Sequence, residues 1–328
     1  MEQTEERSVI VNIPRSIGNT LLIAVNVIDG YIFRQHFEYL KLAGQRTPMV
    51  FGKDGFTVTR GNGTGTIVTQ SRFHANKLLE YQFNTQSIID ANEREREYRA
   101  SLGNGTGTGT DNGTDNGTGD NTNYDSDFDQ SNPTLTINLN TPEFINHIKS
   151  LTKKSSIRLI HYAEHPDVVK CQLTGSARGS ECTVFLHTEM ISLEGYNIPH
   201  GIPDDAKPNA KTSMATFCAS CNDLERARLA YCIFQCYPNA VTLYSANEQS
   251  TSGRVAHWTS DAKSNSSRIV SNSSVAVTRV PISVIKVMKK MGGWGVGIVS
   301  IYSRTSGYVR IDSSIGYFGD NTTYLIEQ

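Results

Sequence analysis

The sequence lacks the features that would identify several common classes of protein. It has no run of about 18 apolar residues, the length that a membrane-spanning helix needs. The opening segment MEQTEER is charged and has no apolar core of a secretion signal. The sequence also contains no P-loop, no HExxH metal motif and no Gly-x-Ser-x-Gly nucleophile elbow. We therefore expect a soluble, intracellular protein that is not an enzyme, carries no cofactor and does not associate with a membrane.

An excess of charge of either sign is missing as well, with 31 Lys and Arg against 32 Asp and Glu in 328 residues. This balance excludes a histone-like basic binder and a highly acidic, solvated chain. The charge is unevenly distributed, however, because residues 101–132 hold six Asp and no Lys or Arg. Removing these six negative charges from the net charge of −1 leaves +5 on the rest of the chain.

Two segments stand apart from the rest by composition. We expect a disordered insertion at about residues 85–133, because Gly103 to Asn132 consist of Gly, Thr, Asn and Asp and offer almost nothing apolar to bury. Three prolines between residues 192 and 211 indicate a linker. The resulting division is an N-terminal extension (1–20), a first domain (21–191), the linker (192–211) and a second domain (212–328).

Outside these segments, a pattern of strand, helix, strand, turn and strand occurs four times. The distance from helix start to hairpin turn is 24 residues in three units and 25 in the other, with helix starts at Gly30, Pro142, Asn222 and Pro281. The third unit is expected to begin with a strand at Ala215–Cys218. The pattern predicts an α+β fold of two similar domains, each made of two β-α-β-β units, with helices on one face of antiparallel sheets.

Three of the four helices pair an apolar stripe with a basic one. In the first helix, for example, Phe33 and Phe37 share one face while Arg34 and Lys41 lie on another. Basic residues on a single helix commonly do no more than face water. Their recurrence on equivalent helices of a near-neutral chain favours contact with a phosphate backbone, which is sensitive to salt and carries no sequence information.

The repeat and the basic helices resemble the sliding clamps of the proliferating cell nuclear antigen (PCNA) type. Local matches are Asp29-Gly30-Tyr31-Ile32-Phe33-Arg34 through Leu40-Lys41, Gly55-Phe56-Thr57-Val58, Gly201-Ile202-Pro203 and Tyr324-Leu325-Ile326. The resemblance spans roughly residues 20–328 at the level of pattern. It implies a DNA-clamp fold in which three copies close head to tail around double-stranded DNA, with the helices lining the hole. The implied function is that of a DNA polymerase processivity factor in DNA replication.

The resemblance also implies site residues. Those that would face DNA are Arg34, Lys41, Lys149, Lys153, Arg226, Lys286 and Lys290. Those that would accept the clamp-binding peptide of a DNA polymerase or another replication protein are Ile202, Pro203, Tyr324 and Ile326. Strand Thr183–His187 would pair with Arg254–Thr259 of a neighbouring subunit through Thr183, Phe185, His187, Val255, His257 and Thr259. A clamp loader is a further implied partner, and the expected location is the nucleus or a viral replication site in the cytoplasm.

Several alternatives stay open at this point. An open processivity factor could keep the fold without closing a ring, and a viral structural or assembly protein could use the duplicated units for packing. The third helix has little net positive charge, and the insertion has no usual counterpart in clamps. Cys218, Cys221, Cys232 and Cys236 could form a zinc site, although reduced buried thiols explain their spacing better. The divergence suggests a large DNA virus or a protist as the source.

Overall fold

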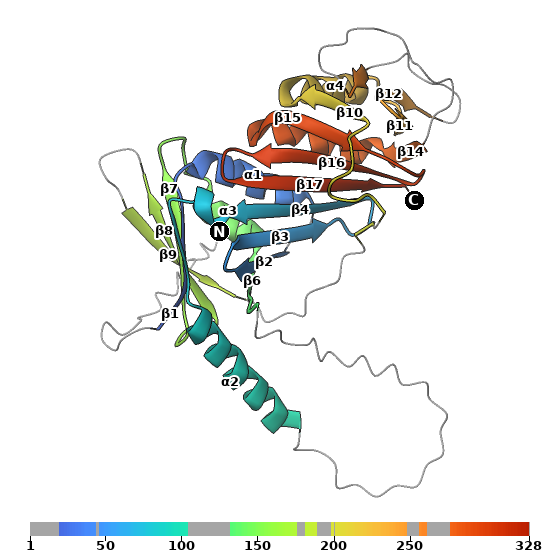
Figure 1. Ribbon diagram of the computed structural model, residues 1–328. Helices are drawn as coiled ribbons and strands as arrows, with labels where there is room; N and C mark the ends of the chain where they lie inside the picture. Colours follow the sequence, from blue (N-terminus) through green and yellow to red (C-terminus); the bar gives the residue numbers. More distant parts are fainter. Residues whose placement is uncertain are drawn as a thin grey trace, which may run out of the picture.

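A computed structural model describes residues 20–43, 46–103, 132–175, 181–188, 198–199, 201–247, 256–260 and 276–327. Within these ranges the chain folds into antiparallel sheets flanked by α-helices (Figure 1). All strand pairs between neighbouring elements are antiparallel, and the fold class expected from the repeat is confirmed.

The described residues of the first half of the chain form nine strands. Its elements are β1 (Leu21–Val27), α1 (Gly30–Ala43), β2 (Arg46–Gly52), β3 (Gly55–Gly61), β4 (Ile67–His74), the 3-10 turn η1 (Ala75–Lys77), β5 (Glu80–Phe83), α2 (Thr85–Gly103), β6 (Leu135–Asn140), α3 (Thr141–Ile148), β7 (Ser156–Tyr162), β8 (Val168–Thr174) and β9 (Glu181–His187).

The second half repeats the order of strand, helix and strands. Its elements are β10 (Ala210–Ser213), α4 (Met214–Arg226), β11 (Tyr231–Tyr237), β12 (Ala240–Ala246), β13 (Ala256–Thr259), β14 (Ala276–Pro281), α5 (Ile282–Met288), the 3-10 turn η2 (Lys289–Gly293), β15 (Gly295–Tyr302), β16 (Tyr308–Ile315) and β17 (Gly319–Ile326).

Short polar side chains start three of the helices. The Asp29 carboxylate accepts a hydrogen bond from the Ile32 amide of α1 (3.0 Å), and Asn140 accepts one from the Glu143 amide of α3 (3.1 Å). Ser213 accepts one from the Thr216 amide of α4 (3.1 Å). Such N-caps satisfy amide groups that have no partner within the helix.

One sheet joins the two halves. Its strand order is β10-β15-β16-β17-β4-β3-β2-β6, so it contains strands from both. The junction is the pair β4 and β17, which runs in register from Gly319 opposite Phe73 to Leu325 opposite Ile67. Two further sheets, β5-β1-β7-β8-β9 and β13-β12-β11-β14, belong to the first and second half respectively.

Apolar side chains between the helices and the sheets form the core. The rings of Phe56 and Phe73 stack with their centroids 4.3 Å apart, and Phe33, Phe37 and Phe144 of α1 and α3 pack edge to face or tilted beside them. All five are almost fully buried. The aromatic packing fixes α1 and α3 against the first half's strands.

The junction between the halves is polar on its core side. We call six buried side chains there the polar seam: His36, Tyr39, Thr69, Ser71, Asn321 and Thr323. Asn321 Oδ1 accepts hydrogen bonds from Thr69 (2.8 Å) and Ser71 (3.0 Å), and Asn321 Nδ2 donates one to Thr323 (2.9 Å). Tyr39 bonds Thr323 (3.1 Å), and His36 Nε2 bonds the Ser71 hydroxyl (2.9 Å). A one-residue shift of β17 along β4 would break this network, so the seam specifies the register between the halves.

Two expectations about local structure are wrong. The segment of about 85–133 is not disordered throughout, because Thr85–Gly103 forms helix α2, whose N-terminus is anchored by the buried side chain of Ile88; residues 104–131 lie outside the described residues. Residues Ala215–Cys218 form no strand but belong to α4, which starts at Met214. The strand that follows this helix is β11, which the sequence reading missed.

Candidate nucleic-acid interface and partner-binding edge

Four helices form a continuous layer across both halves. Helix α1 packs beside α3 in the first half, α4 packs beside α5 in the second, and α1 also meets η2. Each helix turns its apolar residues toward the sheets, including the fully buried Phe37, Phe144, Phe217 and Ile285. The opposite sides of these helices therefore make up one surface that belongs to both halves, which we call the helix layer.

Six of the seven cations expected to face DNA are exposed on or beside this layer. They are Lys41 at the end of α1, Lys149 and Lys153 just after α3, Arg226 at the end of α4, Lys286 on α5 and Lys290 on η2. Arg226 has an acidic neighbour, since its guanidinium lies 3.6 Å from the Asp223 carboxylate. The two side chains are 81% and 57% exposed, so this pair is weak and leaves the arginine accessible.

Arg34 is placed differently from the other six. Its side chain is 19% exposed, and its Nη1 donates hydrogen bonds to the carbonyl oxygens of Lys149 (2.6 Å) and Leu151 (3.0 Å). Glu38 lies 3.4 Å from the guanidinium. The arginine thus ties α1 to the end of α3, where backbone carbonyls lack partners within the helix.

The second half has an equivalent tie. Lys289 of η2 donates to the Glu225 carboxylate of α4, and both side chains are 29% exposed. This hydrogen bond lowers the pKa of Glu225, with a smaller contribution from the nearby charges of Lys286 and Lys290. Each half therefore uses one cation to join two helices of the layer and keeps others exposed.

An aromatic ring accompanies the cations at the first tie. The Arg34 guanidinium and the Lys153 ammonium both lie over the ring of Tyr31. Their distances to the centroid of this ring are 5.1 Å and 5.9 Å. Such contacts favour cations over the ring face. They gather two positive charges at the place where α1 and α3 meet.

The linker lies against the outer face of the joining sheet, beside β16 and the last strand, β17, at a place that we call the linker site. The Ile202 carbonyl accepts a hydrogen bond from Arg310 of β16 (3.3 Å), while Pro203 is exposed. Tyr324 of β17 is 9% exposed, and burial raises the pKa of its phenol. Asp204 and Tyr324 line the same groove, so the structure brings this part of the linker and β17 together; Ile326 is half-buried two residues further on.

Open strand edges lie at the ends of two sheets. Strand β9 is the last strand of its sheet and carries the exposed Thr183 and His187 and the half-buried Phe185. Strand β13 is the last strand of another and carries His257 and Thr259, while Val255 lies outside the described residues. Among the described strands, β9 pairs only with β8 and β13 only with β12, apart from one bridge between Thr188 and Leu139. Each edge therefore offers backbone groups to a further strand.

The cysteines lie in separate elements. Cys218 and Cys221 lie on α4, Cys232 and Cys236 lie on β11, and all six cysteines of the chain are free thiols. Burial raises the pKa of Cys236 to about 12, and the buried Cys221 and Cys232 also have raised pKa values. No group of three or more potential metal ligands comes together within the described ranges, which gives the zinc alternative no support. In those same ranges, no helix is long and apolar enough to cross a membrane.

Sequence reading missed three features of these surfaces. The tie made by Arg34 joins segments 115 residues apart in the chain. The bidentate pair of Arg310 with Asp312 joins two residues of one strand that share a face, a spacing that the sequence does contain. The polar seam was not predicted because Thr and Asn are mostly exposed in proteins, so these residues on a strand are expected to face water. The two-residue period of a strand was the signal that could have revealed it, because this period places Asn321 and Thr323 on the same side as the apolar Leu325.

Comparisons with known proteins place the fold. Searches of protein-family models and of curated proteins found no match. The crystal structure of a PCNA2–PCNA3 complex from Sulfolobus tokodaii is similar, with a TM-score of 0.61 at 13% identity over 92% of this chain and 98% of that chain. That of proliferating cellular nuclear antigen from Entamoeba histolytica is similar with a TM-score of 0.63 at 12% identity, over 94% of this chain and all of that one (100%). The chain therefore has the PCNA-type clamp fold.

Proposed function

We propose that this protein is a sliding clamp, a DNA polymerase processivity factor that encircles duplex DNA as a homotrimer and tethers replication proteins. The observation that carries the proposal is the helix layer, which is shared by both halves and presents Lys41, Lys149, Lys153, Arg226, Lys286 and Lys290. Flexible, exposed cations attract phosphates without fixing the register of the DNA, as sliding requires. The protein performs no bond chemistry in this role.

Ring closure is proposed through the open edges. Strand β9 of one subunit would add to β13 of the next, through Thr183, Phe185 and His187 on one side and Val255, His257 and Thr259 on the other. A head-to-tail contact of this kind uses two different surfaces and closes into a ring when the rotation between subunits allows it. The two edges belong to different halves of the chain, which is the arrangement that a head-to-tail contact needs.

Partner proteins are proposed to bind at the linker site, where Ile202, Pro203, Tyr324 and Ile326 lie. These partners include the DNA polymerase, and a clamp loader would open the ring. In the tethered state, topology holds the complex on DNA while the polymerase binds the outer side of the clamp.

The test uses a linear duplex fixed to a bead at one end. The protein is allowed to thread onto the free end, which is then blocked with streptavidin or left open, and the bead is washed with high salt. We expect retention only when the end is blocked, together with a mass near three times 36.2 kDa by light scattering.

The outcomes separate the candidate functions. Equal loss from open and blocked DNA, with binding at low salt, would favour the open, non-ring processivity factor. An absence of DNA binding at any salt concentration would favour a structural or assembly protein and would contradict the proposal.

A further inference from the structure

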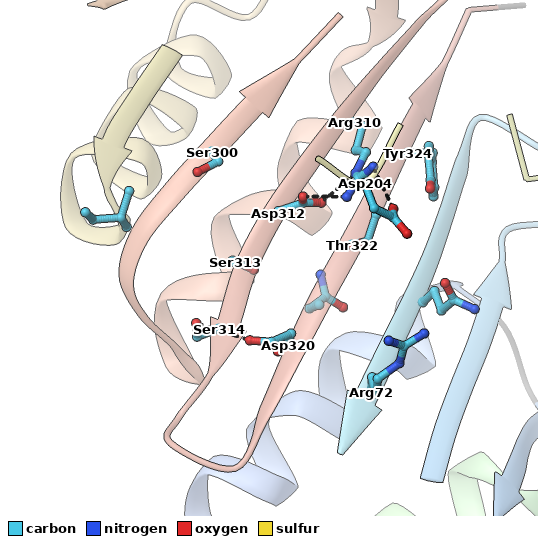
Figure 2. Close-up of a pocket in the computed structure, with 13 residues that line it drawn as sticks. Arg72, Asp204, Ser300, Arg310, Asp312, Ser313, Ser314, Asp320, Thr322 and Tyr324 are labelled. Atoms are coloured by element: carbon cyan, nitrogen blue, oxygen red, sulfur yellow. Dashed lines mark hydrogen bonds and ion pairs between the residues drawn. The ribbon is translucent and has the colours of Figure 1, made fainter. Parts of the chain in front are cut away.

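A groove of about 480 Å³ lies on the face of the joining sheet opposite the helix layer (Figure 2). Val309 and Ile311 of β16 are fully buried in the core, so the alternating Arg310 and Asp312 point to the other side, into the groove. Strands β15, β16, β17 and β4 make its floor, and Asp204 of the linker lies at one end. We call this site the outer groove.

The floor of the outer groove is hydrophilic. Thr322 and Gln70 lie between the charged residues at its two ends, and Ser300 and Ser314 lie beside Asp312 and Asp320. The larger apolar contributions come from Ile298 and Tyr324. A site of this composition offers hydrogen bonds along its length and little apolar surface for a large aromatic side chain. It therefore suits an extended, polar chain.

The end of the outer groove next to the linker is acidic. Arg310 is 9% exposed and forms a bidentate pair with Asp312 (3.0 and 2.9 Å) and a contact with Asp204 (3.3 Å). One guanidinium thus serves two carboxylates, which leaves a net charge of −1. The Asp204 side chain is fully exposed (101%), so it can also accept hydrogen bonds from a ligand.

The other end offers a free cation. Arg72 of β4 is exposed and has no hydrogen-bond or ion-pair partner in the part of the chain that the structure describes. Its strand neighbour Asp320 is already engaged, by His74 at 2.7 Å and by the Ser314 hydroxyl at 3.5 Å. Figure 2 shows Arg72 apart from the cluster around Arg310.

The strand register gives the distance between the two ends. Arg310 lies opposite Tyr324, and Arg72 lies opposite Asp320, so the ends are four residues apart along β17. At about 3.4 Å per residue this separation is about 14 Å along the strand direction, which an extended peptide that runs parallel to the strands covers in about four residues.

We propose that the outer groove binds an extended peptide of a partner protein that carries a Lys or Arg at the Asp204 end and, about four residues away, an Asp or Glu at Arg72. The proposal rests on the proposed function, in which partners bind at the linker site, and names the chemistry of what they present there. A nucleic-acid strand fits poorly, because the lining holds three Asp against two Arg.

The test uses fluorescent twelve-residue peptides of Ser and Thr that carry one Lys and one Glu. The two charges are placed two, four or six residues apart and in either order along the chain. Fluorescence anisotropy at low ionic strength measures binding to the full-length protein. We expect the spacing of four to bind about fivefold more tightly than the others, in one chain direction.

Charge reversal locates the binding. Arg72→Glu should weaken binding of the Lys/Glu peptide and strengthen binding of a peptide in which a second Lys replaces the Glu. Asp204→Lys should weaken binding of every peptide that places a Lys at that end of the groove. Lys53→Glu, an exposed lysine in the turn between β2 and β3, is the matched control and should leave binding unchanged. Binding that is independent of spacing, absent for all peptides, or unaltered by Arg72→Glu would overturn the proposal.

A failure here can be told from a failure of the proposed function. The Arg72→Glu and Asp204→Lys variants should still form a trimer and stay on end-blocked DNA, because the outer groove faces away from the helix layer. If end-blocked retention succeeds while every peptide fails, the clamp function stands and the inference about the groove falls.

Discussion

Arg34 should affect DNA binding by holding the end of α3 in place and not by contacting a phosphate itself. Its two hydrogen bonds, 2.6 and 3.0 Å long, end on the carbonyl oxygens of Lys149 and Leu151. Hydrogen bonds to charged groups contribute about 1.5–3 kcal/mol each, and the partial exposure of Arg34 reduces this amount. We expect Arg34→Gln to lower the free energy of unfolding by about 2 kcal/mol. We expect a smaller loss for Arg34→Lys, because an ammonium lacks the planar fork of donors.

The salt dependence of DNA affinity separates the two roles. Each phosphate contact contributes about 0.9 to the slope of log K against log salt concentration. We expect Arg34→Gln and Arg34→Lys to reduce the affinity of the protein for a short duplex while leaving this slope unchanged. Lys149→Ala, the matched control, should lower the slope by about 0.9.

The reasoning would be refuted by one pattern of results. If Arg34→Gln lowered the slope by about 0.9 while Arg34→Lys restored both slope and affinity, the positive charge of residue 34 would be the relevant property. Arg34 would then be a direct DNA contact, as the resemblance implied.

Three further predictions concern the helix layer and the polar seam. Four exposed lysines are replaced together by alanine: Lys149, Lys153, Lys286 and Lys290. This change should lower the slope of log K against log salt concentration by about 3.6 and leave the melting temperature unchanged. An unchanged slope would show that these lysines do not contact DNA. Asn321→Ala should lower the free energy of unfolding in urea by about 3 kcal/mol, because it leaves buried hydroxyl groups without partners; a loss below about 1 kcal/mol would show that the seam is not a stabilising network. Burial lowers the pKa of His36 from 6.5 to about 3, so its neutral form stabilises the fold above pH 6.5 and this contribution is lost as the pH falls from about 6.5 toward 3. Acidification from pH 7.5 to 5.5 should therefore cost about 1 kcal/mol through this residue, and His36→Gln should reduce the pH dependence seen by thermal melting.

The general architecture could be predicted from the sequence because it is recorded in local patterns. Helix α1 begins at the predicted Gly30, and α3 begins at Thr141, one residue before the predicted Pro142. The hairpin turn at Gly52–Gly55 is formed by residues suited to it. The third unit was misread because Ala215–Cys218 is short and apolar, and such a run is compatible with a strand or with a buried helix. Only the hairpin of β11 and β12, closed at Pro238 and Asn239, decides between them.

The finer features of the site depend on contacts that local patterns do not contain. A helix pattern shows that Arg34 lies away from the apolar stripe, yet the carbonyl groups it binds are more than a hundred residues away. Helix α2 has a weak signal in the sequence. Among its residues whose exposure is described, only Ile88 is buried, and the rest of its sequence is mostly polar and charged, as in a solvated segment. The open edges of β9 and β13 become visible only when the order of strands in each sheet is known.

The junction between β4 and β17 has a consequence for how the chain could be divided. The halves are joined by main-chain hydrogen bonds in seven registered residue pairs and by the seam beneath them, and not only by the peptide bonds of the linker. A protease cut after the exposed Asp204 or Asp205 should leave two fragments that stay associated and separate only on denaturation. For the same reason the two halves, produced as independent polypeptides, should reassemble as a split protein. We therefore expect covalent continuity to be dispensable at the place where the chain passes from one half to the other.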